Sequence, residues 1–437
     1  MNRTLLRTAW TFIGLAGCTS SKTAMHDASV RHAAVAPPVA GNLSAKAGVE
    51  DMVGHALANN PEIAAADARV ARMQAKVPQA KALPDPMAMV SLGNMAQTAS
   101  GRVTAMTGLQ QKLPLPGKRG TKARMAEEEV AAARAMREAK ALSVASMVRN
   151  TYWDLYLAEQ TARVLASSRT LIEAVQTAVE ARLKTNQANQ ADLLQVTTEA
   201  AKLDEQIMLA KRDAEVARAR LNTLMHRPAN APIPTARWQP GIEQLPAQPP
   251  LDDHPSMEQA AAKLRQFNAQ LKLARLERFP DLTAGVQYAA VSNSGLSPVH
   301  NGQDQFYATL GVNIPLWQAP RQAAEDEARA GQRESEAGLA STRDDLAYQL
   351  SETRTRVETQ KRLISLFDDR ILADAKQAFE VSLAGYSSGK LPFVDLIERW
   401  RRWLGYEVQQ SMNRAMLGKA VAAWTQAAGI PVTKDAN

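Results

Sequence analysis

One stretch of the chain reads Phe306-Tyr-Ala-Thr-Leu-Gly-Val-Asn-Ile-Pro-Leu316. Apolar residues occupy every second position, which is the pattern of a strand with one apolar and one polar face. A long helical pattern follows at 319–386, and a return helix at 392–428 follows a break at Gly389. A strand joined to so long a helix predicts an extended assembly rather than a globular domain.

The same order of elements occurs earlier in the chain, beginning with a helix from about Val49 to Ala82. Landmarks recur at nearly constant offsets: Pro84-Asp85 and Pro280-Asp281 are 196 residues apart, and the triplets starting at Leu113 and Ile314 are 201 apart. We therefore predict a duplicated unit. Repeat 1 spans 48–226 and contains a helix, a β-hairpin at 84–116, a long helix at 118–185 and a return helix at 191–226. Repeat 2 spans 252–428 and contains a helix, a β-hairpin at 281–317, a long helix at 319–386 and a return helix at 392–428. A Pro-rich connector at 227–251 joins the repeats, and a tail follows at 429–437.

The N-terminus has the composition of an export signal. Arg3 and Arg7 precede a short apolar stretch, and Leu15-Ala-Gly-Cys18 follows. The apolar part is too short to span a bilayer, so residues 1–17 are predicted to be a signal peptide. The ending resembles the lipobox of bacterial lipoproteins, which implies a lipid on Cys18 and a lipid-anchored tether at 18–47. The alternative is an ordinary signal peptide with an incidental cysteine.

Composition excludes several classes of protein. Cys18 is the sole cysteine, so no disulfide framework exists. The net charge of +8 comes from Lys and Arg interleaved with Glu along helical faces, which indicates solvated faces and no nucleic-acid partner. No apolar window beyond the signal is long enough for a spanning helix, so strands must make any membrane crossing.

The strand count demands oligomerisation. Each repeat supplies two strands, whereas known spanning barrels have at least about eight. Two chains would give eight strands and three would give twelve. The long amphipathic helices also need neighbours that bury their apolar faces. The alternative is a soluble hairpin beside a coiled coil.

A short proline-containing motif stands at each junction between the second strand of a hairpin and the long helix. The two motifs are Leu113-Pro-Leu-Pro-Gly-Lys-Arg119 and Asn313-Ile-Pro-Leu-Trp317. With the duplicated unit and the lipobox, they resemble the TolC-like outer membrane efflux proteins. That resemblance implies a mostly α fold with a small β part: a homotrimer with a 12-stranded β-barrel, continued by a coiled-coil-like α-helical tunnel. It places the tunnel in the periplasm of a Gram-negative bacterium and the 227–251 connector in an equatorial belt.

The resemblance also implies partners and a function. The chain would be the outer-membrane exit duct of a tripartite efflux system with a periplasmic adaptor and an inner-membrane resistance-nodulation-division (RND) pump. The Pro-Gly-Lys-Arg form at 116–119 is most similar to the heavy-metal branch, with metal cations as cargo. The alternative is a non-conducting periplasmic coiled-coil lipoprotein that acts as a scaffold.

Nothing in the sequence predicts catalysis. None of the six histidines has metal-ligand spacing, and Gly117-Lys-Arg-Gly-Thr121 lacks the upstream glycine of a phosphate loop. We predict no enzymatic activity, no cofactor and no metal site. Thioethers do suit Cu(I), but methionines near a hairpin more often serve as packing filler; the candidates are Met87, Met89, Met95 and Met106.

The two helix turns are the candidate gate. In the family they form the periplasmic mouth, and Asp395 and Glu398 match its acidic positions. Residues at i and i+3 share a helix face, so three chains would stack two acidic rings that attract cations. The alternative is that acids in a first turn merely complement the helix dipole.

Other tip residues match the family's closing network. Tyr386 and Asp192 match positions that hydrogen-bond across the closed mouth, although Tyr386 could simply pack between helices. Leu391 occupies the position of the family's arginine partner, and Lys390 is a possible substitute. The tip turns expected to dock the adaptor contain Asn186, Gly389 and Lys390. The nearby Arg399-Trp-Arg-Arg-Trp403 could contact an adaptor, but its tryptophans more often pack between helices.

Overall fold

The computed structural model describes residues 43–44, 47–93, 97–239, 241–296 and 299–430. The expected signal peptide, Cys18, nearly all of the tether, Met95 and most of the tail lie outside these ranges.

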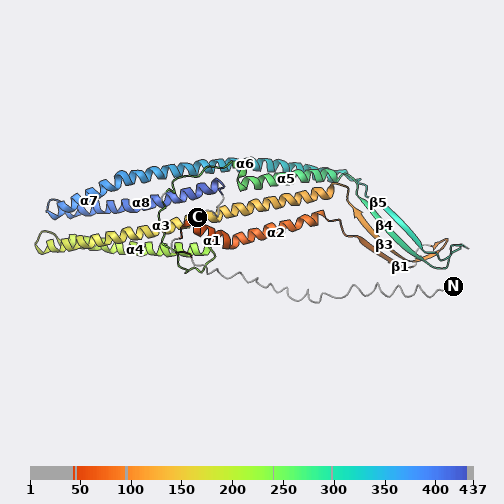
Figure 1. Ribbon diagram of the computed structural model, residues 1–437, viewed down its shortest axis with the longest axis horizontal. Helices are drawn as coiled ribbons and strands as arrows, with labels where there is room; N and C mark the ends of the chain where they lie inside the picture. The colour runs from red at the N-terminus through yellow and green to blue at the C-terminus, as the bar shows by residue number, and fades with distance from the viewer. Residues whose placement is uncertain (1–42, 45–46, 94–96, 240, 297–298, 431–437) are drawn as a thin grey trace. The chain divides into compact units, whose positions relative to one another are not determined.

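Helices and strands follow one another in the same order twice (Figure 1). The first set is α1 (Val49–Asn59), α2 (Pro61–Lys81), β1 (Met87–Leu92), β2 (Gln97–Thr98), β3 (Gly101–Leu113), α3 (Lys118–Lys184) and α4 (Gln190–Leu224). The second set is the 3-10 turn η1 (Leu251–Asp253), α5 (Pro255–Leu276), β4 (Leu282–Val291), β5 (Gln305–Val312), α6 (Gln318–Leu366), the π-helical turn η2 (Phe367–Ile371), α7 (Leu372–Ser387) and α8 (Phe393–Ala427). The prediction of a mostly helical fold with a small β part is confirmed.

The single helix expected from Val49 to Ala82 is wrong, because Asn60 divides it into α1 and α2. Asn60 is extended (φ −67°, ψ 127°), as a residue before proline prefers. Its side chain caps α2 by accepting a hydrogen bond from the Glu62 amide at 2.8 Å, and its Nδ2 donates to the Leu224 carbonyl at 2.8 Å. The break therefore docks this helix pair against the end of α4.

The long second helix is also interrupted. The π-helical turn η2 separates α6 from α7 and presents Asp368 to α8. The Asp368 Oδ1 atom accepts hydrogen bonds from Gln410 Nε2 at 2.6 Å and from Arg414 Nη2 at 3.0 Å. One extra residue in a helical turn leaves the sequence periodicity of a long helix almost unchanged, so the sequence did not indicate it.

The strands form one antiparallel sheet in the order β1–β3–β4–β5, with β2 paired to the start of β3. The pairs Ala88↔Leu109, Leu109↔Val286 and Val286↔Ala308 align one row of side chains across the sheet. The outer edges of β1 and β5 pair with no strand among the described residues. The sheet of a single chain is thus open at both ends.

One face of this sheet is apolar and exposed. Side chains here reach 82% exposure at Phe306, 74% at Leu310 and 68% at Val90. The other face carries glycines and polar residues, including Thr309, Gln287, Gln110 and Lys112. An apolar face of this extent normally marks an interaction surface.

Val103 departs from the predicted alternation. Strict alternation along β3 would put Val103 on the same face as Leu109, but the β3–β4 register shifts between Val103 and Ala105. The shift is a bulge, which turns Val103 to the opposite face, where it packs with Ala289 and Val291.

The helices pack in long antiparallel pairs. Helix α3 lies along α2, α4, α5 and α8, and α6 lies along α5 and α8. A buried core surrounds Trp153, whose ring fits so closely against Gly418 that a Cβ there would lie 2.1 Å from Trp153 Cε2. Trp238 of the Pro-rich segment packs on Trp153, with ring centroids 5.7 Å apart. None of the helices in the described ranges is long and apolar enough to cross a membrane.

Candidate functional site

Two helix turns lie at the end of the helices away from the sheet (Figure 1). Asn186, in the α3–α4 turn, has φ 54°, and Gly389, in the α7–α8 turn, has φ 74°. The Gln187 amide donates to the Arg182 carbonyl, and the Lys390 amide donates to the Gly385 carbonyl, both at 2.9 Å. Both turns therefore reverse tightly through one left-handed residue.

Arg182 and Tyr386 tie the two turns together. The Arg182 guanidinium lies 4.5 Å from the centre of the Tyr386 ring and donates a hydrogen bond to the Tyr386 carbonyl. Its Nη2 also donates to the Gln187 carbonyl at 3.3 Å. Tyr386 is only 4% exposed and packs edge-on against Phe393, with centroids 5.5 Å apart. A cation over an aromatic face is attractive, more so when it is desolvated.

The Tyr386 hydroxyl is buried and has no hydrogen-bond partner among the described residues. Burial raises the pKa of this phenol, and the Asp192 carboxylate raises that pKa further against the opposing effect of Arg182. Within one chain the Tyr386 hydroxyl does not bond to Asp192, and hydrogen bonding across a mouth between chains stays a prediction.

Arg182 is the residue that sequence reasoning missed. Lys390, the suggested substitute for the absent arginine, is exposed and distinct from the cation that covers Tyr386. Leu391 packs against Gly385, where a Cβ would lie 2.6 Å from Leu391 Cδ1. The available signal for Arg182 was its place in the last turn of α3.

Of the three acids considered, Asp192 has a clear structural role. It forms a capping box with Asn189: the Asp192 amide donates to Asn189 Oδ1 at 2.8 Å, and the Asn189 amide donates to Asp192 Oδ2 at 3.4 Å. Asp395 is half-buried in the first turn of α8, and Glu398 is exposed one turn later. The structure places them three residues apart on one helix.

The neighbouring Arg/Trp cluster is largely structural. Trp400 is 2% exposed, and Trp403 stacks on Phe379 at 5.2 Å. Arg401 forms an ion pair with Glu199, whose carboxylate is buried. Burial acts to raise the pKa of Glu199, but hydrogen bonds from Arg401 and Lys202, together with their charges, hold that pKa below its ordinary value.

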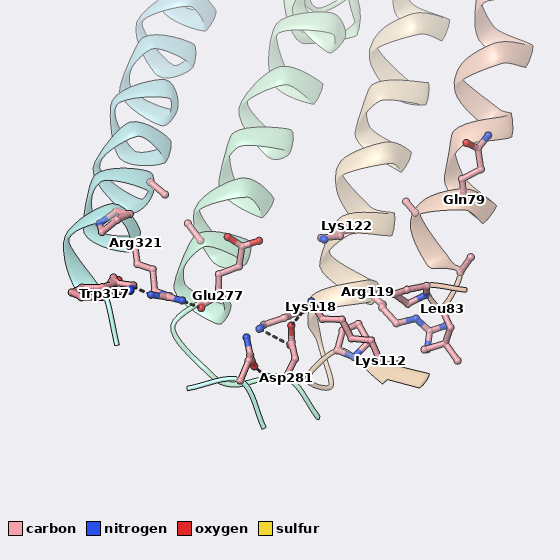
Figure 2. Close-up of a pocket in the computed structure, with 18 residues that line it drawn as sticks. Gln79, Leu83, Lys112, Lys118, Arg119, Lys122, Glu277, Asp281, Trp317 and Arg321 are labelled. Carbon is pink, nitrogen blue, oxygen red and sulfur yellow. Dashed lines mark hydrogen bonds and ion pairs between the residues drawn. The ribbon is translucent and has the colours of Figure 1, made fainter. Parts of the chain in front are cut away.

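A second site lies where strands become helices (Figure 2). An open pocket of about 800 Å³ is lined by the ends of α2, α3, α5 and α6. Asp281 lies at its base, 2.7 Å from the Lys118 Nζ atom and 3.6 Å from that of Lys112. Its Oδ1 also accepts a hydrogen bond from the Leu115 amide at 3.0 Å. The Lys118 of one junction motif thus holds the Pro280-Asp281 landmark of the other repeat.

Electrostatics at Asp281 follow from these contacts. Burial acts to raise the pKa of the carboxyl, but the hydrogen bonds from Lys118 and Leu115 outweigh it, so the pKa lies below its ordinary value. In the parts of the chain described, no group of three or more His, Cys, Asp or Glu residues is arranged to hold a metal ion.

An open sheet with an exposed apolar face, joined to a helix of 67 residues, is the architecture expected of a TolC-like channel protein. The chain belongs to the outer membrane efflux protein family, whose profile matches residues 52–226 and 248–430. The members of this family and the solved neighbours are channel proteins and not enzymes, and the same holds for this chain.

Two relatives and one solved structure illustrate the likeness. The cobalt-zinc-cadmium resistance protein CzcC of Cupriavidus metallidurans is 23% identical over 376 residues, covering 81% of this chain and 83% of CzcC. The pyoverdine export outer membrane protein OpmQ of Pseudomonas aeruginosa is 24% identical over 386 residues, covering 81% of this chain and 79% of OpmQ. CusC superposes with a TM-score of 0.74 at 18% identity, over 90% of this chain and 97% of CusC.

Proposed function

We propose that three copies of this chain form the outer-membrane exit duct of a tripartite efflux system. The duct conducts passively, receiving solutes from an inner-membrane RND pump through a periplasmic adaptor. Family membership supports the efflux role, and the open sheet supports the trimer.

The observation that carries the proposal is the sheet with two unpaired edges and one exposed apolar face. Backbone groups inside a bilayer must all be paired, so such a sheet is stable there only after closure. Four strands are too few to close a spanning barrel, whereas three chains supply twelve. In that barrel β5 of one chain pairs with β1 of the next, and the apolar face meets lipid.

The helix turns then form the periplasmic mouth. Arg182 and Tyr386 hold the two turns of each chain together, and Asp395 and Glu398 supply the proposed acidic rings. The exposed tip residues Asn186, Gly389 and Lys390 are proposed to dock the adaptor. A lipid on Cys18 would add a second attachment to the outer membrane.

Heavy-metal cargo is the first substrate class to test. The CzcC likeness supports it, and the OpmQ likeness supports pyoverdine export at similar identity. Deleting the gene in its host and measuring tolerance to cobalt, zinc and cadmium would distinguish the two: loss of tolerance supports metal efflux.

The duct itself is tested on the purified protein. We expect extraction with outer-membrane porins, migration as a heat-sensitive trimer and ion conductance in planar bilayers. A scaffold would instead leave the membrane once its lipid was removed and would not conduct. Non-conducting, delipidation-released protein would contradict the proposal.

A further inference from the structure

The pocket at the strand–helix junction is strongly basic. Two acidic side chains line it, Glu277 and Asp281. Five basic side chains line it, namely Lys112, Lys118, Arg119, Lys122 and Arg321. Each chain therefore has an excess of three positive charges around one opening, which we call the basic collar (Figure 2).

Little of this charge is neutralised locally. Asp281 is shared between Lys118 and Lys112. Arg119 donates to the Lys81 carbonyl at 2.6 and 3.0 Å, and Arg321 donates to the Trp317 carbonyl at 2.5 Å.

The carbonyl groups that accept from Arg119 and Arg321 orient the two guanidinium groups without cancelling their charge. Lys122 is exposed and forms no ion pair with any described residue. The uncompensated charge of the collar is therefore available to a passing solute.

The collar opens on the polar side of the sheet. Lys112 continues the polar alternation of β3 after Gln110, and Asn313 continues that of β5 after Thr309; both line the pocket. The polar side of a closed spanning barrel faces its lumen. Arg124, two residues from Lys122 on α3, lines a different pocket between α3 and α5.

We propose that the basic collar is an anion-attracting ring inside the duct, at the passage from helical tunnel to barrel. This rests on the proposed function. Three copies place an excess of nine positive charges around one passage. Rings of Lys and Arg select anions in pores, and low-dielectric walls concentrate such a field. The cargo class that fits the collar is an anionic solute, either an organic anion or a metal carried as a negatively charged complex.

The test is ion selectivity, measured as the reversal potential across a planar bilayer in a potassium chloride gradient. Lys122→Gln and Lys122→Glu remove one and two charges per chain from the collar. Arg124→Gln and Arg124→Glu make the same changes on the other side of the same helix. We expect the chloride-to-potassium permeability ratio to fall by about twofold or more in Lys122→Glu, less in Lys122→Gln, and to stay unchanged in both Arg124 variants.

Equal shifts at both positions, or no shift at either, would overturn the collar. A protein that does not conduct at all would instead contradict the proposed duct, so the two failures are distinguishable. Citrate and the zinc–EDTA complex, added to one side, probe the two anion sources. If both anions block the current less in Lys122→Glu than in wild type, the collar attracts anions by charge alone. If only one anion does so, that anion source is assigned. If neither does so, the proposal is overturned.

Discussion

At the scale of single residues, the contact between Arg182 and Tyr386 holds the two helical hairpins of one chain together. The guanidinium covers the ring and donates to the backbone of the opposite turn. Such a contact is worth about 0.5–2 kcal/mol, depending on its desolvation.

We expect Arg182→Ala to lower the thermal midpoint of trimer dissociation and to raise conductance, because the two turns are released from each other. Lys184→Ala, an exposed cation in the same helical turn, is the matched control and should change neither. Both are measured by heated gel electrophoresis and bilayer recording. Equal behaviour of the two variants would contradict the tie.

The proposed acidic rings make a separate prediction. Asp395→Ala combined with Glu398→Ala should alter single-channel conductance and weaken block by divalent cations in planar bilayers, because the attracting charge is gone. If conductance and block both stay at wild-type values, these acids serve only the helix dipole.

Asp281 predicts a pH dependence at the strand–helix junction. Its pKa in the folded protein lies below the ordinary value of 3.8, so its contribution to stability is present above pH 3.8 and is lost as pH falls through the folded pKa. Asp281→Asn should remove this acid-sensitive part and cost about 1–3 kcal/mol near neutral pH, because Lys118 loses its buried partner. Thermal midpoints across the acid range compare the two proteins; parallel curves would contradict the assignment.

At the scale of elements, the sheet shows what a sequence can and cannot predict. The alternation from Phe306 to Val312 predicted β5 and its apolar face, because side-chain direction in a strand depends only on position. The bulge that turns Val103 was not predictable, since it depends on pairing with β4.

Among the helices and turns, too, some features were predictable from the sequence and others were not. Gly389 and Asn186 marked the turns by their own conformational preferences. Arg182 could not be selected from the many cations on α3, because its role depends on Tyr386, which lies 204 residues away. The π-helical turn likewise depends on contacts with α8. Local chemistry predicted the elements, and tertiary contacts decided the details of the site.

The two faces of β4 give the prediction at this scale. Val286 is 60% exposed on the apolar face, and Gln287 is next to it on the polar face. Val286→Arg should prevent stable membrane insertion, because a cation on a lipid-facing strand costs about 2–4 kcal/mol near the bilayer centre. Gln287→Arg should assemble normally, as judged by outer-membrane fractionation and the heat-sensitive trimer. Tolerance of Val286→Arg would place the apolar face away from lipid.

At the scale of the whole molecule, a single chain leaves both edges of its sheet unpaired among the described residues. Its sheet ends at β1 on one side and at β5 on the other, and its apolar face is uncovered. Both needs are met if three sheets close into one barrel. The helices that follow each hairpin then continue the barrel as a tunnel wall.

The most direct test of this closure is a disulfide between chains across the β5–β1 seam. Ser91→Cys on β1 is combined in turn with Tyr307→Cys, Thr309→Cys and Gly311→Cys on the same face of β5, and each single variant is the control for Cys18. If three chains close the barrel, at least one pair gives cross-linked dimers and closed trimers on oxidation, which a reductant reverses. Monomers alone in every pair, from protein that is folded and in the membrane, would contradict a barrel built from three chains.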